Sequence, residues 1–156
     1  MIDRIYIPTV NRVHEQATFS AIPEPLKSRV TMVVQQWERP QYFYDCEYLI
    51  LPDEIALTDY LCLAKTRKFI YETGANTKYC VLDDDLAFKR RNQKYFGLPS
   101  DMGTSKRDCT EDDMLEMFDL YDRWLDDVTF CGGHISCLPP SKKEFRNNGP
   151  VFSQLF

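Results

Sequence analysis

The sequence predicts an α/β fold in which a mostly parallel sheet is flanked by helices. Short apolar runs alternate along the chain with polar loops and a helical segment, an order typical of parallel strands joined by right-handed crossovers. The apolar runs are nearly continuous, as expected of strands that are buried on both faces. At 156 residues the chain has the length of one domain, 1–156, and can bury a substantial core.

Each element is expected from a local signal. Apolar residues cluster in four segments that are expected to be strands: residues 5–7, 30–34, 48–51 and 79–82. The first of these strands stops at Pro8 and the third at Pro52. A polar turn over residues 9–16 leads to a short helix that ends near Pro23. A helix over residues 58–73 ends at Gly74, a common stop residue. Next come a short strand (87–91) and a loop (92–109). An amphipathic helix then begins at Thr110, which forms a capping box with Asp113, and a strand (128–135) follows the helix.

Composition excludes several classes of protein. Hydrophobic residues make up 44% and aromatic residues 13% of the chain, which is too apolar for a disordered protein. The net charge of −5 disfavours a general nucleic-acid coat, although Lys89, Arg90, Arg91 and Lys94 form a local basic run. No apolar stretch reaches membrane-spanning length, so no membrane partner is expected. The six cysteines show no disulfide framework, and a cytoplasmic location is predicted.

The strongest chemical signal is an acidic triplet, Asp83, Asp84 and Asp85, directly after the apolar strand 79–82. Three carboxylates at one strand end repel each other unless a cation neutralises them. Mg²⁺ and Mn²⁺ prefer oxygen ligands and leave room for substrate phosphates. In an extended chain Asp83 and Asp85 point the same way and Asp84 points opposite, so Asp83 and Asp85 are the predicted metal ligands. The alternative is a solvated acidic turn.

Two arginines are candidate partners for anions. Arg67 lies within the predicted inner face of the helix 58–73, and a guanidinium there needs a carboxylate or a phosphate. Both alternatives place Arg67 beside the acidic triplet. Arg12 follows the first strand in a polar turn and is either a phosphate contact or a surface residue. The predicted inner face comprises Tyr60, Leu63, Ala64, Arg67, Ile70 and Tyr71.

Two segments resemble the GT-A glycosyltransferases. Residues 5–12, Ile-Tyr-Ile-Pro-Thr-Val-Asn-Arg, resemble the opening strand of that family, which runs into Pro-Thr-x-x-Arg at the nucleotide pocket. Residues 82–86, Leu-Asp-Asp-Asp-Leu, resemble the Asp-x-Asp element that holds a divalent metal on a sugar nucleotide. The closest resemblance is to the TET-associated glycosyltransferases, found largely in bacteriophages. It covers residues 4–91.

The resemblance implies a short or truncated GT-A domain in which residues 1–91 bind the nucleotide sugar and residues 92–156 face the acceptor. Mn²⁺ or Mg²⁺ would bind Asp83 and Asp85. The implied nucleotide-sugar contacts are Pro8, Thr9, Arg12, Glu38, Pro52, Arg67, Asp83, Asp84 and Asp85. The implied acceptor-side residues are Gly132, Gly133 and His134.

The implied reaction moves a sugar from a UDP-sugar, UDP-glucose or a relative, to a hydroxyl acceptor. The family acts on hydroxymethylated pyrimidines of phage DNA, which implies modified DNA as acceptor and a host cytoplasm as location. No catalytic base is assigned, and Asp126, Asp127 and His134 are the late candidates. The alternatives are a nucleotidyltransferase and a non-enzymatic nucleotide-binding or interaction protein.

Overall fold

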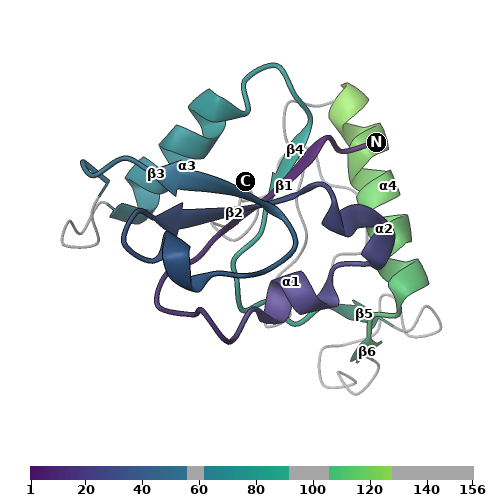
Figure 1. The fold of residues 1–156 in the computed structure, drawn as a ribbon. Coiled ribbons are helices and arrows are strands. Elements are labelled where there is room, and N and C mark those ends of the chain that lie inside the picture. Colours follow the sequence, from purple (N-terminus) through teal and green to yellow (C-terminus); the bar gives the residue numbers. More distant parts are fainter. Residues whose placement is uncertain (56–61, 92–105, 128–156) are drawn as a thin grey trace.

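A computed structural model describes residues 1–55, 62–91 and 106–127 (Figure 1). Four parallel strands form the main sheet, in the order β3-β2-β1-β4. They are β1 (Arg4–Pro8), β2 (Val30–Gln35), β3 (Glu47–Leu51) and β4 (Tyr79–Val81). The predicted α/β class, the parallel sheet and the strand positions are confirmed, with ends that differ by at most one residue.

Helices α1 (Ala17–Ala21) and α2 (Glu24–Lys27) join β1 to β2, and the short 3₁₀ helix η1 (Arg39–Gln41) follows β2. Helix α3 (Cys62–Thr73) joins β3 to β4, and α4 (Glu111–Asp127) is the last described element. A small antiparallel pair, β5 (Lys89–Arg91) and β6 (Lys106–Asp108), precedes α4. Strand β6 falls within a segment that was predicted to be loop. The predicted strand 128–135 lies outside the described residues.

Alternate residues of β1 face two separate cores. Ile5 and Ile7 are fully buried in a cluster with side chains from α1, α2 and α4, whereas Tyr6 packs with Ile70 of α3. Helices therefore cover both faces of the sheet, as the continuous apolar strands predicted (Figure 1). None of the helices within the described ranges is long and apolar enough to cross a membrane.

The inner face predicted for α3 is wrong in part. Leu63, Ala64 and Tyr71 are exposed, and the buried residues of this helix are Thr66 and Ile70. Phe69 is partly buried and packs against the same core cluster as Ile70. The buried face of α3 therefore lies around Thr66, Phe69 and Ile70 and differs from the face that apolar periodicity predicted. Residues 58–61 of the predicted helix lie outside the described residues.

Sheet order determines where a ligand site can form. The chain enters at β1, moves to β2 and β3 on one side, and returns through α3 to β4 on the other side of β1. The connections therefore diverge between β1 and β4. In open α/β sheets, ligands bind outside the carboxyl ends of the strands at this switch point.

Candidate functional site at the carboxyl edge of the sheet

The acidic triplet lies at this switch point, directly after β4. Its side chains do not pair as predicted. Asp84 and Asp85 both contact Arg12, at 3.6 Å from Nε and 3.1 Å from Nη2, whereas Asp83 contacts Nη2 of Arg67 at 3.2 Å. Strand β4 ends at Val81 and residues 84–85 form a turn, so the alternation of an extended chain does not apply to the triplet.

Arg67 lies beside the triplet, as predicted, and its contact there is the Asp83 carboxylate. Both side chains are partly shielded, with exposed fractions of 18% for Arg67 and 26% for Asp83. Burial raises the pKa of the Asp83 carboxyl, and the Arg67 charge partly opposes that rise. Asp83 is therefore held in a partly shielded ion pair with Arg67.

A buried threonine orients Asp84. The Thr9 hydroxyl donates to Oδ2 of Asp84 at 2.6 Å and accepts from Nε2 of Gln16 at 2.7 Å. The Tyr42 hydroxyl lies 3.4 Å from the Thr9 hydroxyl oxygen, and burial raises the pKa of Tyr42. Thr9 was predicted to contact the nucleotide, but its hydroxyl is used to hold a carboxylate.

The backbone of the triplet is held from α1. The Thr18 hydroxyl, which is fully buried, donates to the Asp83 carbonyl at 2.5 Å and accepts from the Leu86 amide at 2.9 Å. The Thr18 amide also donates to the Asp84 carbonyl at 3.1 Å. Sequence reasoning missed Thr18 and Tyr42, because their contacts span 65 and 33 positions and leave no local pattern. It also missed Gln16, whose contact with Thr9 spans seven positions of an irregular turn that has no regular period.

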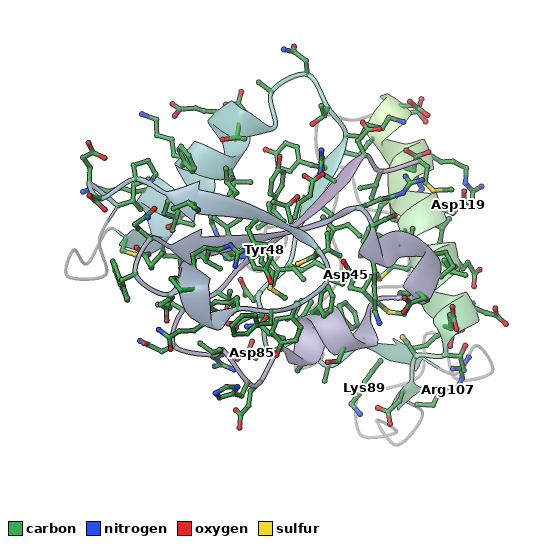
Figure 2. The ribbon with its side chains drawn as sticks, in the orientation of Figure 1. Asp45, Tyr48, Asp85, Lys89, Arg107 and Asp119 are labelled. Carbon is green, nitrogen blue, oxygen red and sulfur yellow. The ribbon has the colours of Figure 1, made fainter. Side chains whose placement is uncertain are left out.

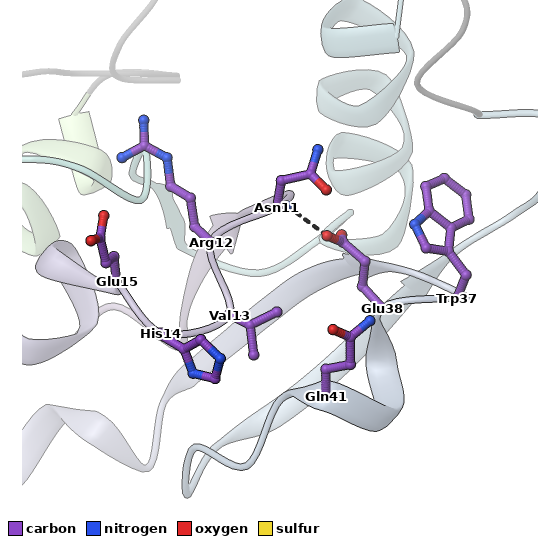
Figure 3. A pocket seen from close by; sticks show the side chains of 8 residues that line it. All are labelled: Asn11, Arg12, Val13, His14, Glu15, Trp37, Glu38 and Gln41. Atoms are coloured by element: carbon purple, nitrogen blue, oxygen red, sulfur yellow. Dashed lines mark hydrogen bonds between the residues drawn. The ribbon is translucent and has the colours of Figure 1, made fainter.

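A cavity of about 510 Å³ opens between the loops that follow β1 and β2 (Figure 3). Glu38 lies in its wall and is only 3% exposed. Its Oε1 accepts from the Asn11 amide at 2.6 Å, whereas its Oε2 is buried without a hydrogen-bond partner in the described part of the protein. Trp37, half-exposed, offers an aromatic face. The cavity is lined by Asn11, Arg12, Val13, His14, Glu15, Trp37, Glu38 and Gln41.

Arg12 connects the cavity with the acidic triplet, because it lines the first and contacts Asp84 and Asp85 of the second. The predicted residues Thr9, Arg12, Arg67, Asp83, Asp84 and Asp85 are thereby brought together, with Glu38 across the cavity. Pro8 ends β1 at the same edge. The site thus combines a shielded carboxylate, an aromatic side chain, two guanidiniums and three aspartates.

Other candidates do not join this group. Pro52 follows β3, and β2 and β1 lie between that strand and β4. Asp126 contacts Nζ of Lys78 at 2.5 Å, next to the start of β4 and hence at the opposite edge of the sheet. The structure therefore does not bring Asp126 to the triplet as a catalytic base. Gly132, Gly133, His134 and Lys94 lie outside the described residues.

The local basic run that begins at Lys89 is partly neutralised within the chain. Lys89 contacts Asp108 at 2.6 Å, and Arg90 contacts Asp113 at 2.5 Å and also Glu116. Figure 2 shows Lys89 together with Arg107 at the β5–β6 pair. Arg90 and Arg107 hold the β5–β6 pair against α4 through Asp113, whereas the Lys89–Asp108 contact lies within the pair. The charge of these cations is therefore less available to an external phosphate.

The predicted metal ligands, Asp83 and Asp85, are not part of a preformed cluster of three ligands within the described residues. Across residues 1–55, 62–91 and 106–127, no group of three or more His, Cys, Asp or Glu side chains could hold a metal ion. Comparison with protein families, with curated proteins and with solved structures finds no match for this chain. The fold class is therefore established by the sheet itself, as parallel α/β and compatible with a Rossmann-like arrangement.

Proposed function

We propose that this protein binds a sugar nucleotide with a divalent cation at the carboxyl edge of its sheet and transfers the sugar to a hydroxyl acceptor. One observation supports the proposal above the others. The cavity beside Glu38 and the acidic triplet are adjacent, and Arg12 belongs to both. A ligand with a base at one end and a diphosphate at the other matches that arrangement.

The cavity suits the nucleoside half of such a ligand. The buried Oε2 of Glu38 is an acceptor without a donor among the described residues, and a donor from a ligand would compensate for its lost hydration. Uracil and guanine present a ring N–H there, whereas cytosine and adenine present a ring nitrogen acceptor that would repel the carboxylate. Trp37 supplies an aromatic surface on which a base can stack. A UDP-sugar satisfies both requirements.

The triplet suits the diphosphate and its cation. Hard divalent cations in phosphate sites are often bound by one or two carboxylates plus substrate oxygens, so a group of three protein ligands is not required. The aspartates are the donors for such an ion, and Arg12 and Arg67 are the cations that would contact phosphate oxygens. When bound, the cation would stabilise negative charge on the departing diphosphate.

The acceptor of this proposal is a hydroxyl group, with hydroxymethylated pyrimidine in DNA as the specific candidate. The described residues supply positioning and charge stabilisation, and we assign no catalytic base. Thr9 and Thr18 would keep the aspartates in register while the ligand binds, because both are buried and hydrogen-bonded to the triplet.

Thermal unfolding tests the proposal. UDP-glucose with Mn²⁺ should raise the melting temperature of the full chain, since a ligand that binds only the folded state stabilises it. An Asp83→Asn, Asp85→Asn double variant should lose the effect. The control removes two exposed carboxylates from α4, Asp119→Asn and Asp127→Asn, and should keep it.

Sugar transfer is then measured directly. Mass spectrometry after incubation with UDP-glucose, Mn²⁺ and hydroxymethylated DNA should detect the mass of one hexose per modified base. Stabilisation by ATP and not by UDP-sugars would instead favour nucleotidyl transfer. Absence of any nucleotide effect would reject the enzyme proposal and favour an interaction protein.

A further inference from the structure

Strand β3 is one edge of the main sheet, and within the described residues no strand pairs with its outer side. Figure 1 shows it as the outermost strand, beyond β2. Its five residues pair with β2 in continuous register, so no bulge turns the edge away. The opposite edge, β4, has only three residues. An open edge presents a row of amide and carbonyl groups to any strand that approaches it, and β3 is the longer such edge in this sheet.

The side chains of β3 lack the features that usually protect an edge. Natural edge strands carry lysine, proline or inward-pointing charges, whereas residues 48–51 are Tyr-Leu-Ile-Leu. Ile50 is 40% exposed, although the next residue, Leu51, is buried. The one charged side chain of the strand, Glu47, contacts Arg4 of β1 and is neutralised within the chain. The strand therefore exposes apolar surface along an edge that can still form hydrogen bonds.

The charges around β3 match a second copy in antiparallel orientation. At the start of the strand, Arg39 lies 3.7 Å from the centroid of the Tyr48 ring, and exposed Asp45 balances its charge. The other end is acidic, because Asp53 and Glu54 are both exposed and no described cation pairs with them. An antiparallel pair sets the balanced start of one strand against the acidic end of the other.

The alternative orientation is electrostatically worse. In a parallel pair the two acidic ends would lie side by side, whereas an antiparallel pair separates them by at least a strand length, roughly 16 Å. That separation exceeds the distance of about 8 Å over which exposed charges interact at physiological salt. A second copy also offers the same open apolar edge, so one two-fold contact covers both edges at once.

We propose that this protein forms a dimer in which β3 of one copy pairs antiparallel with β3 of a second copy, so that the two four-stranded sheets become one continuous sheet. With the two-fold axis at Leu49, Tyr48 of each copy lies opposite the partner's Ile50 on one face of the sheet. Aromatic and β-branched side chains form favourable cross-strand pairs, and the exposed Ile50 becomes covered. The dimer does not depend on the proposed sugar transfer, because β3 carries none of the acidic triplet.

Sedimentation velocity of the full chain, at concentrations from roughly 1 μM to 1 mM, measures the association. The natural protein should change from monomer to dimer within this range. Ile50→Lys places a charge on the exposed edge and should raise the dissociation constant about tenfold or more, because the two-fold axis puts the change in the interface twice. Tyr71→Lys is the matched control: Tyr71 is 67% exposed in the last turn of α3, which leads to β4. Its dissociation constant should stay within about twofold of the natural value.

Amide hydrogen exchange of the natural protein locates the contact without any substitution. Amides of residues 47–51 that point away from β2 should exchange more slowly at high than at low protein concentration, because the second copy protects them. Amides of β2 and β1 in the middle of the sheet should be protected equally at both concentrations.

Three results would overturn the proposal. They are a protein that stays monomeric up to roughly 1 mM, a dimer that Ile50→Lys and Tyr71→Lys weaken equally, and concentration-dependent protection that is confined to elements other than β3. Circular dichroism checks that Ile50→Lys folds; if it does not, hydrogen exchange of the natural protein decides the question by itself. Failure of UDP-glucose to bind would reject the proposed function and leave these expectations for the dimer unchanged.

Discussion

Replacing Thr9 by valine tests whether the buried threonine supports the acidic triplet. Valine has nearly the shape of threonine but lacks its hydroxyl, so the change leaves no cavity. The hydroxyl is 2.6 Å from Oδ2 of Asp84 and 2.7 Å from Nε2 of Gln16, and Thr9 is 6% exposed. The variant therefore removes a buried hydrogen bond to a carboxylate that is itself 13% exposed.

Hydrogen bonds to charged groups contribute about 1.5–3 kcal/mol each. Gln16 keeps its second bond, to the Arg12 carbonyl at 2.8 Å, so the Asp84 bond dominates the loss. We expect Thr9→Val to lower the free energy of unfolding by about 2 kcal/mol. For a chain of this size that corresponds to roughly 4–8 °C in melting temperature.

Thr31→Val is the matched control. Thr31 lies in β2, is 5% exposed, and its hydroxyl oxygen is buried without a hydrogen-bond partner within the described residues. The same chemical change should therefore leave stability unchanged or raise it by about 1 kcal/mol. Urea unfolding of both variants, with equal m-values, measures the difference. If both valine substitutions shift the midpoint equally, Thr9 does not hold Asp84 and the reasoning fails.

Three further outcomes are expected. Ile70→Ala should cost about 3 kcal/mol in urea unfolding, whereas exposed Leu63→Ala should cost under about 0.5 kcal/mol; equal losses would contradict the assigned face of α3. The Arg107 guanidinium and the Thr110 amide hold the pKa of Asp113 well below its usual value, so the Asp113 carboxylate stabilises the fold above the usual carboxyl pKa and loses that effect as pH falls below it. The difference in unfolding free energy between the natural protein and Asp113→Asn should therefore shrink from pH 6 to pH 3. A difference that stays constant over this range would refute the assignment. Glu38→Gln should weaken UDP binding roughly tenfold by calorimetry, because the amide would place a donor against the base N–H; unchanged affinity would exclude Glu38 from the nucleotide.

Elements with a local signal were predictable from the sequence. Apolar runs located all four strands of the main sheet, and the order of strands and helices determined that they are parallel. The capping box is likewise local: the Asp113 carboxylate accepts from the Thr110 amide at 2.8 Å, and the Thr110 hydroxyl accepts from the Asp113 amide at 3.3 Å. Such features depend on residues a few positions apart, so a single chain segment contains the information.

The grouping of side chains in the site depended on the tertiary structure. The sequence located the acidic triplet after a strand, but the turn at residues 84–85 decided that Asp84 shares Arg12 with Asp85. Burial of Glu38 with one oxygen unpartnered followed from the packing of two loops that follow different strands. These contacts join residues 27 to 75 positions apart, and no short-range pattern encodes them. The chain by itself therefore determined which chemical groups the carboxyl edge carries, whereas the packed fold decided which of them meet.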